Sequence, residues 1–185
     1  MDKAYKTEFY RTYLIDALPE PLTRASRHLQ IFDNYITNTR MRLRSIRTPE
    51  TKAWTYLLQQ SIRLETPKGL RSKSAEMHLD EAEHAQLEIF EGNEIRKNRY
   101  FHEFDSRMFA FDVYLGTLWG VNRTRIDFEN EKDLLEFRPP PFAVFEITNE
   151  RFFDDANLVN ETLESVREAV ANLTPAATAV AVPDE

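Results

Sequence analysis

Charged side chains recur two residues apart in several separate stretches of the chain. Arg42 and Arg44 form one such pair, and Lys97 and Arg99 form another. In an extended chain alternate residues point to the same face, so each pair can aim two side chains at one ligand. Guanidinium groups bind phosphate oxygens through two parallel hydrogen bonds. The spacing therefore indicates strands that present bases to a polyanion.

Carboxylates also occur in the extended stretches, and one of them lies two residues from a further base, Arg125. Asp127 follows Arg125 by two residues, Asp112 lies in an apolar stretch, and Glu8 lies in the first extended stretch. Carboxylates among phosphate-binding bases would hold Mg²⁺ or Mn²⁺, which take oxygen ligands and bridge to phosphates. For any one stretch, a solvated strand face with charges of both signs is the alternative interpretation.

The elements that must position these side chains are mostly strands. Composition and period-two alternation predict strands at residues 5–15, 28–36, 40–47, 53–61, 72–79, 94–104, 108–115, 121–128 and 142–148. Helices are expected at 81–90, with Asp80 as N-cap, at 129–135 and at 154–173. Such a pattern predicts an α+β fold, a closed antiparallel barrel with flanking helices and a polar lumen.

Composition limits the classes of protein that fit. The chain has 185 residues, no cysteine and a net charge of −7. We expect one domain over residues 1–173 and a disordered tail over 174–185. No stretch is apolar enough for a membrane span, and the N-terminus lacks a signal peptide, so a cytoplasmic location is expected. The acidic charge argues against nucleic-acid binding but allows a local basic pocket. The oligomeric state is not predicted.

Several short motifs follow one another in a fixed order. Glu8-Phe9-Tyr10-Arg11-Thr12 opens the chain, and Arg42-Leu43-Arg44 follows. Next come Ile95-Arg96-Lys97-Asn98-Arg99-Tyr100, Phe111-Asp112-Val113-Tyr114 with Gly116, and Arg125-Ile126-Asp127-Phe128. Phe145-Glu146-Ile147-Thr148 closes the series.

This order resembles the CYTH, or triphosphate tunnel metalloenzyme, family over about residues 5–159. The family includes inorganic triphosphatases, thiamine triphosphatases and class IV adenylyl cyclases. The resemblance implies an eight-stranded tunnel that binds a triphosphate or polyphosphate, with Mg²⁺ or Mn²⁺ as cofactor. It also implies site residues: phosphate binding by Arg42, Arg44, Lys97, Arg99 and Arg125, metal binding by Glu8, Glu76, Asp112 and Asp127, and catalysis by Glu8 and Asp127.

The sequence departs from the family pattern mainly on the acidic side. The opening Glu-x-Glu-x-Lys motif becomes Glu8, Tyr10 and Thr12, one member of the next acidic pair is Ala110, and a later Glu-x-Glu becomes Arg125 and Asp127. The basic residues of the family pattern are retained better than its acidic residues. Arg125 could therefore replace the missing metal charge directly.

Three functions remain open at this point. The first is a divergent tunnel protein that binds a triphosphate or polyphosphate with weak or lost hydrolysis. The second is an active metal-dependent triphosphatase, acting on inorganic, nucleoside or thiamine triphosphate, whose metal site is rearranged around Glu8, Asp112 and Asp127. The third is a barrel that serves as a scaffold for protein interaction.

Overall fold

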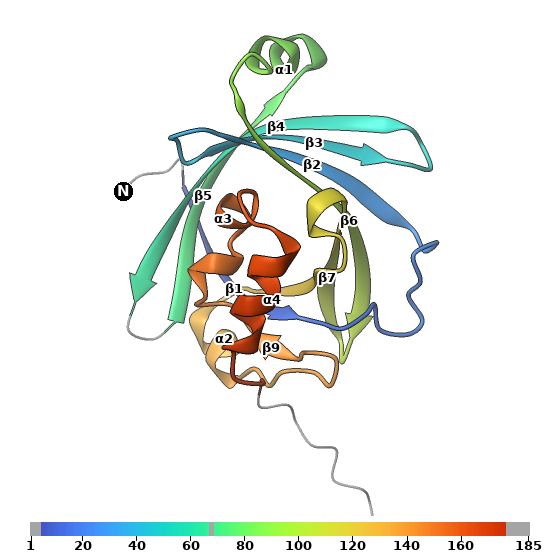
Figure 1. Cartoon of the computed structure of the whole chain (residues 1–185), viewed down its shortest axis with the longest axis vertical. Coiled ribbons are helices and arrows are strands. Elements are labelled where there is room, and N and C mark those ends of the chain that lie inside the picture. Colours follow the sequence, from blue (N-terminus) through green and yellow to red (C-terminus); the bar gives the residue numbers. More distant parts are fainter. Residues whose placement is uncertain (1–4, 67–68, 177–185) are drawn as a thin grey trace, which may run out of the picture.

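The computed structural model describes residues 5–66 and 69–176, so the tail predicted over 174–185 lies, beyond residue 176, outside the described residues. Eight long strands form a closed antiparallel barrel, which confirms the predicted fold class (Figure 1). The strands are β1 (Lys6–Leu14), β2 (His28–Ile36), β3 (Met41–Thr48), β4 (Ala53–Thr66), β5 (Gly69–Leu79), β6 (Gly92–Phe104), β7 (Arg107–Tyr114) and β8 (Asn122–Phe128).

The barrel closes through β1, which pairs with β8 on one side and with β5 on the other. Around the barrel the order is β1, β5, β4, β3, β2, β6, β7, β8. A short ninth strand, β9 (Phe145–Glu146), also pairs with β1 near its end. Because every long strand pairs with two neighbours, the sheet closes on itself.

Alternation along the strands separates the lumen from the outer wall. On β8, Arg123 and Arg125 line the lumen, whereas Ile126 and Phe128 belong to an apolar cluster that includes Phe109. Residues of α2 (Glu131–Glu136) and of the segment after it pack on this cluster. The period-two pattern thus supplies both the polar interior and the apolar outer layer.

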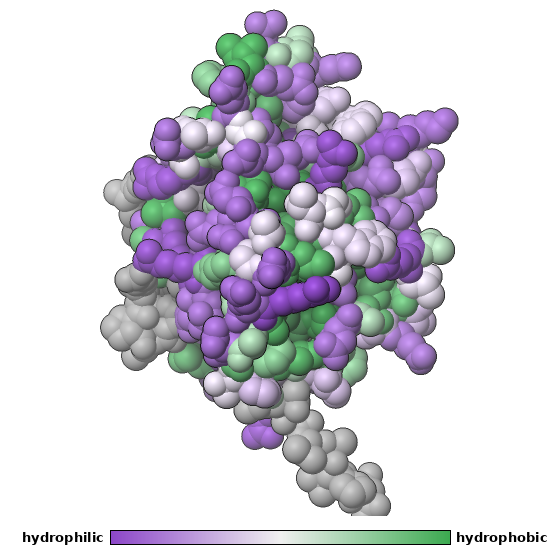
Figure 2. All heavy atoms as spheres, in the orientation of Figure 1, coloured by the Kyte–Doolittle hydropathy of each residue, from purple (hydrophilic) through white to green (hydrophobic). Residues whose placement is uncertain are grey.

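A second apolar cluster continues the inner face at one end of the barrel. Ile95 and Tyr114 lie two residues from inner-face charges and pack with Phe153, Leu158 and Val166 from the C-terminal segment. The C-terminal segment contains η2 (Arg151–Phe153), α3 (Asp155–Leu158) and α4 (Leu163–Ala171). In Figure 1 these elements lie between β5 and β6, and Figure 2 shows hydrophobic side chains near the centre of the same, mostly hydrophilic, face.

The helices differ in part from the prediction. Asp80 is the N-cap of α1 (Glu81–Leu87) as expected, and its side chain and that of Glu83 form a capping box. The helix predicted at 154–173 is instead two helices, because Thr162 caps a new start and forms a capping box with Ser165. The remaining short helix is η1 (Gly116–Leu118). No helix in the described ranges is long and apolar enough to cross a membrane.

Candidate functional site

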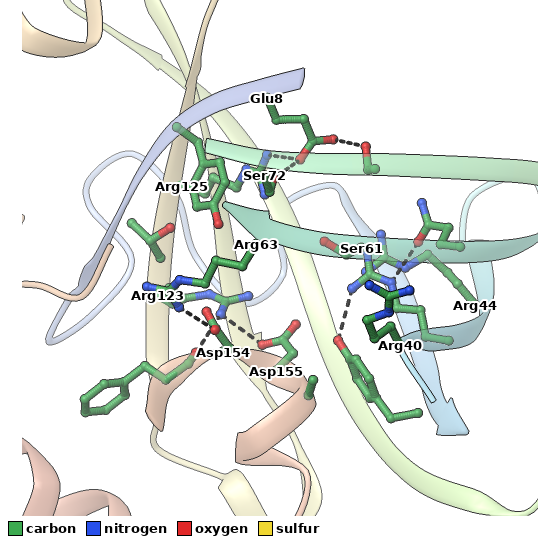
Figure 3. A pocket seen from close by; sticks show the side chains of 18 of the residues that line it. Glu8, Arg40, Arg44, Ser61, Arg63, Ser72, Arg123, Arg125, Asp154 and Asp155 are labelled. Carbon is green, nitrogen blue, oxygen red and sulfur yellow. Dashed lines mark hydrogen bonds and ion pairs between the residues drawn. The ribbon is translucent and has the colours of Figure 1, made fainter. Parts of the chain in front are cut away.

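The barrel encloses a cavity of about 450 Å³ that is rich in charged side chains (Figure 3). Its eight cationic lining residues are Arg40, Arg42, Arg44, Arg63, Lys97, Arg99, Arg123 and Arg125. Four carboxylates also line it: Glu8, Asp127, Asp154 and Asp155. All five bases predicted to bind phosphate lie on this cavity, as do the two carboxylates predicted to be catalytic. An acidic chain thus encloses a lumen with an excess of bases.

On one wall, Arg42 and Arg44 of β3 face Asp33 of β2. Arg44 holds Asp33 with two parallel bonds, from Nε at 2.6 Å and from Nη2 at 2.7 Å. Arg42 donates to Gln59 at 2.8 Å and to the Tyr35 hydroxyl at 3.0 Å, and its Nη1 lies 3.6 Å from Asp33. Burial disfavours the charge of Asp33, but Arg42 and Arg44 outweigh burial and lower its pKa to about 2.

The adjoining wall, which begins with β6 beside β2, contains a cluster of five charges, which we name the inner cluster: Lys97, Arg99, Asp112, Arg123 and Asp155. Asp112 accepts two bonds from Arg99, at 2.6 and 2.8 Å, and lies 3.1 Å from Lys97 and 3.2 Å from Arg123. Asp155 lies 2.5 Å from Lys97 and 2.9 Å from Arg123. The two carboxylates therefore hold the three bases together.

Burial sets the electrostatics of the inner cluster. The Lys97 side chain is 1% exposed and that of Asp112 is 3% exposed. Burial lowers the pKa of Lys97 despite the two nearby carboxylates. For Asp112, burial opposes ionisation, but Arg99 and Lys97 outweigh it and hold the pKa well below the usual range. Asp112 is thus an ionised carboxylate whose oxygens are already occupied by bases.

A second group of charges lies on β1 and β8, and we name Glu8, Arg125 and Asp127 the rim cluster. Arg125 Nη2 lies 3.2 Å from Glu8 Oε2 and 2.5 Å from Asp127 Oδ1. Ser72 and Ser74 also donate to Glu8, at 3.1 and 2.6 Å. Burial opposes ionisation of Glu8, but Ser74 and Arg125 outweigh it and lower its pKa. One guanidinium nitrogen thus bridges two carboxylates.

Tyr10, one of the departures from the family pattern, supports this arrangement. The guanidinium carbon of Arg125 lies 4.0 Å from the centre of the Tyr10 ring. A guanidinium stacked on an aromatic face gains a cation–π attraction in addition to its ion pairs. Tyr10 and Arg125 therefore act together, since the ring positions the base between the two carboxylates.

The predicted metal ligands do not form a metal site. Glu8 and Asp127 share Arg125, and Asp112 is saturated by its bases. Glu76 is exposed, accepts a 2.7 Å hydrogen bond from Gln59 and does not line the cavity. Among the described residues no group of three or more His, Cys, Asp or Glu could hold a metal ion. The donor set thus fits an arginine better than Mg²⁺ or Mn²⁺.

Several lumen residues were not identified from the sequence. Arg63 lies beyond the predicted end of its strand, which continues to Thr66. It donates to Asp154 at 2.5 Å and to the Thr148 carbonyl at 3.1 Å. Arg123 lies two residues before Arg125, so alternation could have found it.

Arg40 lies near the exposed edge of the cavity, directly before β3. Its side chain is exposed and lines the cavity. Within residues 5–66 and 69–176, its guanidinium has no hydrogen-bond or ion-pair partner. It differs in this respect from Arg42 and Arg44 of β3, the strand that begins at the next residue.

Comparisons with known proteins identify the fold. No family model matches the chain, and no curated protein matches its sequence. Among solved structures, a crystal structure described as the inorganic triphosphatase NE1496 matches with a TM-score of 0.56 and 20% sequence identity. The match covers 83% of this chain and 95% of that chain.

A second crystal structure, described as the hypothetical protein NE1496, gives the same TM-score and identity. It covers 84% of this chain and 99% of the other. The chain is therefore similar in fold, over nearly the whole of that protein, to the barrel of an inorganic triphosphatase.

Proposed function

We propose that the barrel lumen binds a linear triphosphate or polyphosphate and hydrolyses it weakly or not at all, as a divergent member of the CYTH family. The charge of the lumen supports binding. Eight bases and four carboxylates line a cavity of about 450 Å³, whereas the whole chain has a net charge of −7. That volume lies within the range of small-molecule sites, about 300–1,000 Å³. Phosphate is the ligand class that a group of guanidinium groups recognises best.

The arginines also retain donors for a ligand. Arg44 uses Nε and Nη2 on Asp33, and Arg99 uses the same two atoms on Asp112. A guanidinium has five N–H donors, so both side chains keep donors at Nη1 that no described residue accepts. Because the paired carboxylates fix both guanidinium planes, little side-chain entropy would be lost when a phosphate binds.

One observation supports the proposed loss of hydrolysis: Arg125 lies between Glu8 and Asp127. Its Nη2 lies 3.2 Å from one carboxylate and 2.5 Å from the other. A guanidinium there contributes positive charge to phosphate binding, but it has no water to deliver as a nucleophile. Loss of one electrostatic catalytic group typically lowers kcat about 10²–10³-fold. We therefore expect the native chain to bind triphosphate with little hydrolysis.

The test is a phosphate-release assay run beside a thermal-shift assay. Tripolyphosphate, ATP and thiamine triphosphate are incubated with the native chain in EDTA and in Mg²⁺ or Mn²⁺. We expect tripolyphosphate to raise Tm at low salt, with phosphate release near background in every condition. One ligand at 100 times its Kd adds about 2.7 kcal/mol to folding stability.

Two results would count against the proposal in different ways. Metal-dependent turnover that Asp127→Ala abolishes would favour the rearranged triphosphatase instead. The absence of any thermal shift at low salt would reject the phosphate site and leave the scaffold function.

A further inference from the structure

Two consecutive carboxylates enter the lumen from the C-terminal segment. Asp154 and Asp155 lie between η2 and the first turn of α3, and both line the cavity. The residues on either side, Phe153 and Leu158, are 3% and 1% exposed and belong to the apolar cluster that closes this end of the barrel. Packing on both sides therefore fixes the backbone that presents the two carboxylates.

These carboxylates are paired with three of the lumen bases. Asp155 lies 2.5 Å from Lys97 and 2.9 Å from Arg123, and it accepts a short hydrogen bond from Tyr114. Asp154 lies 2.5 Å from Arg63. The labelled side chains of Arg63, Arg123, Asp154 and Asp155 come together in one part of the cavity in Figure 3. An anion that enters this part of the lumen meets bases already bound to carboxylates.

The pairing leaves donors unsatisfied. The Nε atoms of Arg63 and Arg123 are buried and have no hydrogen-bond partner among residues 5–66 and 69–176. A buried N–H without an acceptor is costly, and because neither Nε is exposed to the cavity, an oxygen ligand can satisfy it only when these side chains shift away from the aspartates. Two carboxylates thus neutralise the charge of these bases without using all of their donors. A ligand with more oxygens can satisfy donors that the two aspartates leave free.

We propose that Asp154 and Asp155 act as an internal competitor that sets how much negative charge a ligand must have to be held in the lumen. The inference rests on the proposed phosphate site and deepens it. Orthophosphate and pyrophosphate have few charges to compete for Arg63, Lys97 and Arg123. A longer phosphate chain contacts these bases and the Arg42 and Arg44 wall together. The aspartates therefore select long chains over short ones.

The test compares phosphate chains of increasing length by isothermal titration calorimetry. Orthophosphate, pyrophosphate and tripolyphosphate are titrated into the native chain and into Asp154→Asn and Asp155→Asn. Glu164→Gln is the matched control, because Glu164 is exposed on α4 and the substitution changes net charge equally. We expect each aspartate variant to bind pyrophosphate about tenfold more tightly than the control does, with a smaller gain for tripolyphosphate.

Asp155 is more deeply buried than Asp154, with side chains 7% and 39% exposed. Asp155→Asn is therefore expected to lower Tm, and Asp154→Asn serves if the other variant does not fold. Pyrophosphate affinity in Asp154→Asn equal to that of Glu164→Gln overturns the inference, even if native protein binds tripolyphosphate. Binding to Asp154→Asn with none to native protein supports the competitor and rejects the proposed function of the native chain. No binding to any variant rejects both.

Discussion

The inner and rim clusters use the same motif in two different environments. In each, an arginine of β8 lies between two carboxylates: Arg123 between Asp112 and Asp155, and Arg125 between Glu8 and Asp127. The two arginines are two residues apart and share a face of the strand. The Arg123 side chain is 12% exposed and that of Arg125 is 29% exposed.

The difference in exposure determines how much each cluster contributes to stability and how readily its ion pairs can be exchanged for a ligand. In the inner cluster, removal of one partner leaves a buried charge unpaired, which is far more costly than the ion pair itself is worth. In the rim cluster, water screens the pairs, so they contribute little to stability and can be exchanged for a ligand. We therefore expect the ion pairs of the inner cluster to contribute more to the stability of the barrel than those of the rim cluster, although residues of both clusters line the cavity.

The largest effect is expected from Asp112→Ala. Asp112 holds three bases and is 3% exposed, so the substitution leaves buried positive charges unpaired. We expect the free energy of unfolding to fall by about 3–5 kcal/mol, measured by urea denaturation. The matched change in the rim cluster, Asp127→Ala, is expected to cost less than about 1 kcal/mol. Equal losses would remove the distinction between the clusters.

An intermediate effect on stability is expected at acid pH from Asp33, a buried carboxylate outside the two clusters. Its side chain is fully buried, and its pKa is lowered from 3.8 to about 2 by Arg42 and Arg44 against burial. The resulting stability is present above pH 4 and is lost as pH falls through about 2. This loss is about 2 kcal/mol. Asp33→Asn should remove that part of the acid dependence in urea titrations between pH 5 and 2, and an unchanged slope would contradict it.

The smallest effect on stability is expected from Arg125→Gln. Because Arg125 is partly exposed, the free energy of unfolding should change by less than about 1 kcal/mol. Affinity for tripolyphosphate should nevertheless fall about tenfold or more, since Glu8 and Asp127 then repel the ligand. Arg27→Gln is the matched control, because that side chain is 83% exposed in the loop before β2. Equal affinities of the two variants would exclude Arg125 from the site.

The strands and their inward faces could be predicted because period-two alternation is local information. Partner choice could not, because it depends on strand register. Asp112 lies opposite Arg99 on β6 and opposite Arg123 on β8, and neither pairing is contained in the sequence of β7. For the same reason the sequence indicates that Asp112 is available as a metal ligand, whereas in the fold its carboxylate is paired with three bases.

The C-terminal carboxylates were missed for a different reason. Residues 154–173 have helical spacing, which indicates an amphipathic helix on the surface. The capped start at Thr162 divides that stretch, and the buried side chain of Leu158 brings the preceding turn into the barrel end. The position of Asp155 thus depends on tertiary packing that the helical pattern does not contain.

We propose that the lumen binds a polyphosphate with its own arginines and that a metal ion is not required for binding. Calorimetric titration of tripolyphosphate into the native chain in EDTA tests it most directly, at low and at high salt. We expect one binding site per chain in EDTA, with an affinity that falls as salt rises. Binding that appears solely after Mg²⁺ or Mn²⁺ is added would rule out a metal-free site, because the metal and not Arg125 would then supply the positive charge.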